Sequence, residues 1–76
     1  NIHVNPNPIH DFMNITMSKG EYTISLFNGF GKLILKKQLN GNSIIDTKSL
    51  IAGLYYYTIT NAHSKIIYSS KVEKLK

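Results

Sequence analysis

The sequence predicts an all-β fold, a small immunoglobulin-like β-sandwich of about seven short antiparallel strands. Short runs that alternate apolar and polar residues recur along the chain, and Gly, Asn or Pro separates them at near-regular spacing. No run with helical periodicity is long enough to predict an extended helix. An OB-type barrel is the alternative architecture for the same pattern.

The most apolar and aromatic run, residues 53–59, is expected to be the central strand. Tyr55, Tyr57 and Ile59 share one face, and the opposite face is also mostly apolar, which favours a strand with a neighbour on each side. Gly53 opens the run, and we expect it to hold a positive φ or to allow close backbone packing. The expected strands are residues 2–4, 12–17, 21–27, 32–39, 43–46, 53–59 and 65–72.

Strand 21–27 has the clearest alternation, with Tyr22, Ile24 and Leu26 directed inward. In strand 32–39, Lys37 interrupts an otherwise apolar face. We expect either a β-bulge near Lys36 and Lys37 or a Lys37 side chain that reaches solvent at the strand end. In the last strand, Ile66, Tyr68 and Val72 are expected on one side.

The connections have their own signals. Pro6 and Pro8 each remove a backbone donor, so residues 5–8 must form an edge or a turn. Asn-Gly pairs at residues 28–29 and 40–41 predict hairpin turns. Residues 46–50 are expected to form one helical turn capped by Asp46.

Composition limits the class of protein. A chain of 76 residues forms one domain, here residues 1–76, and its hydrophobic fraction of 42% makes a packed core feasible but marginal. Because the chain begins with Asn rather than Met, we expect it to be a piece of a longer polypeptide. No apolar run approaches the roughly 20 residues that span a bilayer as a helix, so no direct membrane insertion is expected.

The net charge is +5, and every basic residue is a lysine. Such a surface attracts nucleic acid, anionic lipid or an acidic protein groove. Lysine lacks the planar fork that arginine uses to bind bases and phosphates through two hydrogen bonds. A nucleic-acid partner is therefore not favoured, although the charge keeps it as a third hypothesis.

The sequence does not predict an enzyme. His3, His10 and His63 lack the spacing of metal ligands, and the acidic residues are scattered over separate elements. The serines lie in strands and turns without a nucleophile-elbow pattern, and the chain has no cysteine. We expect no catalytic residue, no metal and no cofactor.

The C-terminal end is cationic. Its lysines are Lys65, Lys71, Lys74 and Lys76, with Glu73 as the one acidic residue among them. Lysines on an edge strand can guard it against aggregation, and they can equally serve in recognition. Spacing alone leaves both interpretations open.

Three stretches resemble the type A C-terminal sorting domain of proteins exported by the type IX, or Por, secretion system of Bacteroidetes-type bacteria. They are Val-Asn-Pro-Asn-Pro at 4–8 with Asp-Phe-Met-Asn-Ile at 11–15, the hairpin at 22–32, and Leu-Ile-Ala-Gly-Leu-Tyr-Tyr-Tyr at 50–57. Their order and spacing agree with the family over essentially the whole chain. Val4 stands where an aromatic residue is common, and Ser64-Lys65 replaces a frequent Gly-Lys turn.

The resemblance implies a secretion signal that directs an attached N-terminal cargo domain across the outer membrane. It implies recognition by the outer-membrane translocon and its β-barrel shuttle protein, frequent removal by a sortase-like peptidase, and a secreted or cell-surface destination. Its motif positions, which we expect to be mainly structural, are Asn7, Pro8, Gly53 and Tyr55. Recognition is expected from the closing strand, at Lys65, Lys71, Val72, Lys74 and Lys76.

A final edge strand can dock by strand addition, and its lysines would steer it towards an acidic partner. The alternative is an immunoglobulin-like adhesion or carbohydrate-binding module, which the tyrosine-rich stretch suggests.

Overall fold

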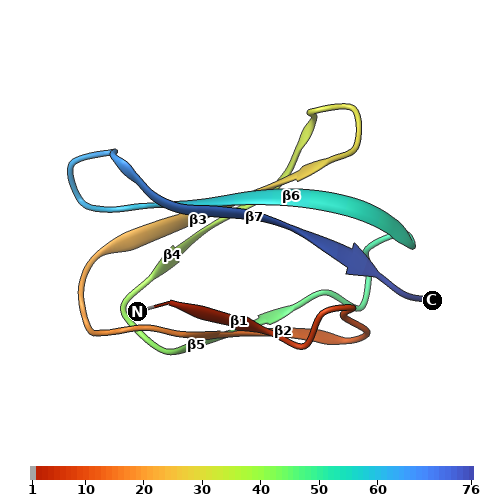
Figure 1. The fold of residues 1–76 in the computed structure, drawn as a ribbon, viewed down its shortest axis with the longest axis horizontal. Helices are drawn as coiled ribbons and strands as arrows, with labels where there is room; N and C mark the ends of the chain where they lie inside the picture. Colours follow the sequence, from red (N-terminus) through yellow and green to blue (C-terminus); the bar gives the residue numbers. More distant parts are fainter. Residues whose placement is uncertain (1) are drawn as a thin grey trace.

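The computed structural model describes residues 2–76 as two β-sheets packed face to face (Figure 1). Within this range the elements are all strands: β1 (His3–Asn5), β2 (Phe12–Thr16), β3 (Tyr22–Asn28), β4 (Leu33–Leu39), β5 (Ser43–Asp46), β6 (Gly53–Thr60) and β7 (Ile66–Lys74). The prediction of an all-β sandwich with seven antiparallel strands is confirmed. Asn1, the first residue of the predicted domain, lies outside the described residues.

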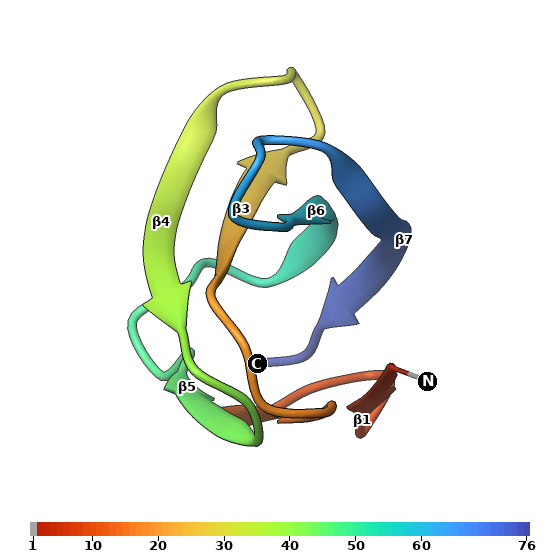
Figure 2. The same cartoon turned by 90° about the vertical axis from the view of Figure 1, so that its left-hand side faces the viewer.

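One sheet has the strand order β1-β2-β5 and the other β4-β3-β6-β7, with antiparallel pairing between all neighbours. Figure 2 shows β1 and β7 along one side of the sandwich, and β4 and β5 along the opposite side. A tight connection joins β4 to β5, where the Asn42 side-chain oxygen accepts a hydrogen bond from the Met17 backbone at 2.9 Å. Strand β6 is central, as predicted, because it pairs with β3 on one side and β7 on the other.

The core lies between the sheets and uses the faces that alternation predicts. Tyr55, Tyr57 and Ile59 of β6 are buried, and so are Ile24 and Leu26 of β3. The other buried apolar residues are Ile9, Met13, Ile15, Met17, Leu39, Ile45 and Val72. Strands β2, β3, β5 and β6 therefore each bury one face, since successive side chains point to opposite sides of a sheet.

Gly53 has a φ of 148°, as expected for a glycine that opens a strand after a turn. Residues 47–50 form a turn rather than the expected helical turn. The Asp46 side chain still accepts a hydrogen bond from the Lys48 backbone at 2.9 Å. A short polar side chain that bonds the backbone two residues on stabilises a turn as readily as a helix start.

The bulge in β4 lies at Ile34, not near Lys36 and Lys37. Leu35 pairs with Leu26 and Leu33 pairs with Phe27, so Ile34 is the extra residue. Lys37 is directly opposite the buried Ile24, yet it is exposed. Because β4 is an edge strand, the long Lys37 side chain can leave the core face sideways and reach solvent. The expectation that Lys37 reaches solvent is confirmed, although it does so at the edge of the sheet and not at the strand end.

The same turn occurs twice, at residues 28–32 and 61–65. Asn28 Oδ1 accepts hydrogen bonds from the backbones of Phe30 and Lys32 at 2.9 and 3.0 Å. Asn61 Oδ1 binds the backbones two and four residues on in the same way, at 2.9 and 3.1 Å. In both turns the fourth residue has a positive φ, 83° at Gly31 and 62° at Ser64.

Each of these turns leads into an edge strand with a bulge two residues after the lysine. In β7 the extra residue is Ile67, because Tyr68 pairs with Ile59 and Ile66 pairs with Thr60. The prediction that Ile66 continues the face of Tyr68 and Val72 is therefore wrong, since the bulge breaks the alternation between them.

Candidate functional site

The closing strand β7 lies at the edge of the four-stranded sheet and has two different halves. We call residues 66–71 the open half and residues 72–74 the covered half. Side chains in the open half are all exposed, whereas Val72 and Lys74 in the covered half are buried. The two halves differ in whether another segment of the chain runs along their outer edge.

Residues 7–10 run along the outer edge of the covered half. The Ile9 backbone donates to the Glu73 carbonyl, and the Leu75 backbone donates to the Ile9 carbonyl, both at 2.8 Å. This is a parallel bridge between the start and the end of the chain. Ile9 itself is fully buried, so the contact joins the two sheets through the core as well as through the backbone.

Asn7 ends this short ladder. Its side-chain oxygen accepts a hydrogen bond from the Glu73 backbone at 3.2 Å, where a continuing strand would offer a carbonyl. The proline on each side of Asn7 lacks a backbone donor and restricts the residue before it, so the chain turns away towards β1. Beyond Asn7, towards the open half, this segment no longer follows β7.

Lys74 lies inside the protein, with 5% of its surface exposed. Its ammonium group donates a hydrogen bond to the His10 carbonyl. The buried Thr47 hydroxyl donates to the same carbonyl at 3.3 Å, and the Thr47 backbone donates to the Asp11 carbonyl at 2.7 Å. A buried charge needs such a partner, and here the partner is the segment that covers β7.

The predicted recognition residues fall into an exposed group and a buried group. Lys65, Lys71 and Lys76 are exposed. Val72 and Lys74 contact the protein's own interior, so their side chains are not presented to a partner in this structure. The alternation of a strand gives the reason: Lys71 points to the outer face of the sheet, while Val72 and Lys74 point between the sheets.

Along the outer edge of the open half, backbone groups have no partner among residues 2–76. Residues 73 and 75 direct their backbone N–H and C=O groups away from β6, towards residues 7–9. Alternate residues of an antiparallel strand direct these groups to the same side, so Ser69 and Lys71 also direct theirs away from β6. Among residues 2–76, no backbone hydrogen bond reaches the outward groups of these two residues. Tyr68 and Ser70 face the other sheet, yet both are exposed.

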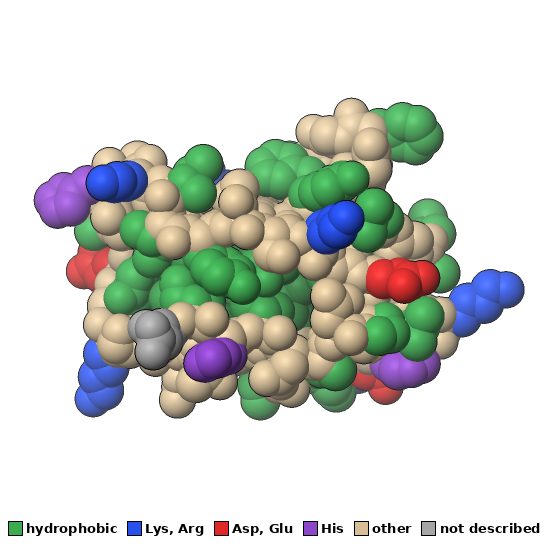
Figure 3. Space-filling view, viewed as in Figure 1, with side chains coloured by type: hydrophobic (Ala, Val, Ile, Leu, Met, Phe, Trp, Pro, Cys, Tyr) green, Lys and Arg blue, Asp and Glu red, His purple; other side chains and the backbone are tan. Residues whose placement is uncertain are grey.

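Apolar side chains are visible between β7 and β1 in Figure 3, because none of the strands in residues 2–76 closes this side of the sandwich. We call this gap the side seam. The buried Tyr57 pairs with Ser70 of the open half, and its ring centroid lies 6.1 Å from that of Tyr68. Loss of solvent around the Tyr57 hydroxyl, together with the neighbouring Tyr68, raises the pKa of Tyr57 well above its usual range.

Residues 3–73 match the model of the secretion system C-terminal sorting domain family. The chain belongs to this family. The match confirms the resemblance to sorting domains of the Por, or type IX, secretion system, a family of signals rather than of catalysts. A search of curated proteins found no match to the chain.

Most of the motif positions that the resemblance implies lie beside the covered half. Gly53 pairs with Lys74, and Tyr55 pairs with Val72. The Tyr55 hydroxyl donates to the Ile51 carbonyl at 2.6 Å, which ties the turn before β6 to the strand. With Asn7 on the outer edge, three of the four expected motif positions contact the covered half or pair with it.

Sequence reasoning missed Ile9, His10 and Thr47, the residues that carry most contacts of the covered half. A signal for Ile9 existed: it is a single apolar residue directly after a proline-rich stretch, at a point where no strand was expected. His10 and Thr47 act largely through backbone groups or a short hydroxyl, which leave no pattern in a sequence.

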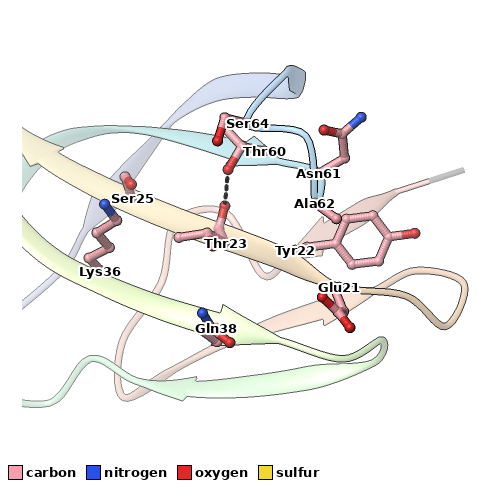
Figure 4. A pocket seen from close by; sticks show the side chains of 10 residues that line it. All are labelled: Glu21, Tyr22, Thr23, Ser25, Lys36, Gln38, Thr60, Asn61, Ala62 and Ser64. Carbon is pink, nitrogen blue, oxygen red and sulfur yellow. Dashed lines mark hydrogen bonds between the residues drawn. The ribbon is translucent and has the colours of Figure 1, made fainter.

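The outer face of the four-stranded sheet has a shallow polar groove near the 61–65 turn, lined by hydroxyl and amide groups with Glu21 and Lys36 (Figure 4). Within it the Thr60 hydroxyl donates to the Thr23 carbonyl at 3.4 Å, and no acid–base pair is formed.

The tyrosine-rich stretch that suggested a carbohydrate-binding module is mostly core. Tyr55 and Tyr57 are buried, which leaves Tyr56, 45% exposed, on the outer face. A sugar-stacking platform would need exposed rings, so the fold uses most of the residues on which that alternative depended.

No group of three or more His, Asp or Glu residues that could hold a metal ion occurs in the part of the chain that the structure describes. Residues 2–76 also contain no helix long and apolar enough to cross a membrane.

Proposed function

We propose that this sorting domain directs an attached cargo protein across the outer membrane through the type IX secretion system. In this proposal the outer-membrane translocon and its β-barrel shuttle protein recognise the domain, and a sortase-like peptidase then removes it from the cargo. The destination of the cargo is the cell surface or the medium. The observation that carries the proposal is the family match over residues 3–73.

The structure supports a role through surface contact. The domain is folded around one core, and its exposed lysines at positions 65, 71 and 76 belong to the closing strand and its flanks. Exposed positive charge speeds encounter with an acidic partner and sets its orientation. We propose that these three lysines guide the domain to the secretion machinery, while Val72 and Lys74 keep the strand in place.

The first experiment fuses residues 1–76 to an inert reporter with a signal peptide in a host that has the system. Reporter in the medium or on the cell surface is the expected result, measured against the same reporter without the domain. A stable fusion that stays in the periplasm would overturn the proposal.

The second experiment separates recognition from folding. Replacing Lys65, Lys71 and Lys76 together by alanine should lower export severalfold, because it removes charge only from the β7 region. The matched control replaces Lys19, Lys32 and Lys36, which are also exposed but lie elsewhere. Equal export by both triple variants, each shown to be folded, would refute the role given to the β7 lysines.

Deletion of residues 71–76 is a poorer test of recognition. It removes the buried Val72 and the Lys74 contact to His10, so it would disturb the fold and the signal together.

A further inference from the structure

The open half of β7 is a short strand edge that is ready to pair. Its outward backbone groups, at Ser69 and Lys71, face away from β6 and have no partner among the described residues. An unpaired edge is a template for an additional strand, and many recognition domains bind extended peptides in this way.

The side seam gives the edge a second property. Tyr68 and Ser70 lie on the face of β7 that points towards the other sheet, but they are exposed. Val4 in β1 and Ile2 just before it are partly buried. A strand added to β7 would place alternate side chains over this seam, because successive side chains point to opposite faces. Apolar residues at those positions would bury surface that is exposed in the domain alone.

The charges around the edge favour an acidic partner. Lys65 precedes the open half, Lys71 ends it, and both are exposed. Carboxylates at the two ends of an added strand would lie near these ammonium groups, whereas basic residues there would be repelled.

A second copy of the chain fits this edge poorly. If two open halves paired antiparallel about residue 68, Lys65 of one would oppose Lys71 of the other, and like charges directly opposite destabilise a sheet. The other edge of the same sheet, β4, is guarded in a further way: Lys37 lies at a core-facing position and occupies the path of an added side chain.

We propose that the open half of β7 binds an extended, acidic segment of a partner protein by strand addition, with apolar side chains of that segment over the side seam. This inference rests on the proposed function and names the chemistry of the partner: an exposed strand with alternating apolar residues and carboxylates at its ends.

The test uses the 76-residue domain and two blocked heptapeptides of alternating valine and threonine. One carries glutamate at both ends and the other carries lysine. Amide hydrogen exchange followed by NMR should slow at Ser69 and Lys71 by at least ~10-fold when the glutamate peptide is added in excess. The lysine peptide should not slow it, and amides of β4 should be unchanged with either.

Ser69→Pro tests the strand pairing itself. Proline removes an outward N–H without removing a hydrogen bond to β6, and proline is tolerated on edge strands at such positions. The variant should remain folded and lose the peptide's protection of Lys71, while Ser69→Ala should keep it. Retained protection in a folded Ser69→Pro domain would overturn the proposal.

Lys71→Glu tests the charge preference and does not depend on how proline is tolerated. This substitution should weaken binding of the glutamate peptide and strengthen binding of the lysine peptide. Lys36→Glu on β4 should leave the binding of both peptides unchanged. Equal protection by both peptides, protection by neither, or protection of Ser69 by dimerisation without peptide would each contradict an acidic strand partner.

The outcomes separate this inference from the proposed function. A fusion that is exported normally, in a domain whose open half binds neither peptide, would overturn strand addition and leave the secretion role intact. A fusion that is not exported would overturn the secretion role, whatever the peptide experiment shows.

Discussion

Lys71 and Lys74 lie three residues apart on one strand, yet they belong to different environments. Lys71, in the open half, is exposed beside backbone groups that have no partner in the part of the chain that the structure describes. Lys74, in the covered half, is 5% exposed and donates to the His10 carbonyl. The strand alternation and the cover provided by residues 7–10 separate them, although the sequence offers the same residue twice.

The comparison shows how one closing strand can serve both the fold and a partner. The covered half joins the beginning of the chain to its end, through Ile9, and fixes where β7 lies. The open half then presents its edge from a rigid base, so a partner need not order it. Changes in the covered half should therefore act on stability, and changes in the open half on binding.

Val72→Ala should have the largest effect on stability. Val72 is 2% exposed and packs in the core beside Tyr55, so its truncation should lower the free energy of unfolding by about 2–3 kcal/mol. Lys71→Ala, one residue away, should change it by less than about 0.5 kcal/mol. Urea unfolding at neutral pH measures both, and similar losses for the two variants would show that the halves do not differ as described.

The sequence predicted which face of a strand is buried better than it predicted which distant segments lie side by side. Alternation placed Tyr55, Tyr57 and Ile59 in the core and made β6 central, because a strand that is apolar on both sides needs support. The covered half was not predictable in this way. Its contacts join Ile9 to Glu73, far apart in sequence, and use backbone groups that every residue possesses.

The bulges explain a second kind of error. A single inserted residue, Ile34 or Ile67, reverses the faces of everything beyond it, and the local sequence gives no sign of which residue is extra. The repeated turn was visible, since Asn28 and Asn61 are each followed by lysine four residues on. Recognising it would have placed both bulges at equivalent positions.

Asn7→Ala should have the next largest effect. It leaves the Glu73 N–H without its acceptor, and loss of one hydrogen bond costs about 1 kcal/mol. Amide exchange at Glu73 should become faster, while exchange at Lys71 should not change. Asn7→Asp keeps an acceptor oxygen and serves as the control; if it destabilises as much as alanine, the hydrogen bond is not what Asn7 contributes.

Ser64→Gly should stabilise the domain by about 0.5–1 kcal/mol, because Ser64 holds a φ of 62° that glycine adopts without steric cost. The equivalent turn offers the reverse change. Gly31→Ser should destabilise by a similar amount, since a Cβ added at Gly31 meets no heavy atom within 4 Å beyond its chain neighbours and the main cost is backbone strain. Thermal unfolding measures both, and shifts of the same sign would contradict the equivalence of the two turns.

Tyr57→Phe should have the smallest effect at neutral pH and a clear one in alkali. Tyr57 is buried behind the open half, and burial raises its pKa, so the folded domain keeps the phenolic proton at a pH where the unfolded chain releases it. This contribution to stability is fully present below about pH 10, the usual tyrosine value, and is lost as the pH rises above it. Tyr57→Phe should remove that part of the alkaline loss, measured by urea unfolding as a function of pH. Tyr56→Phe, on the outer face, should retain the alkaline loss of stability because Tyr57 is intact. Identical stability profiles in alkali for the two variants would mean that water already reaches the Tyr57 hydroxyl through the side seam.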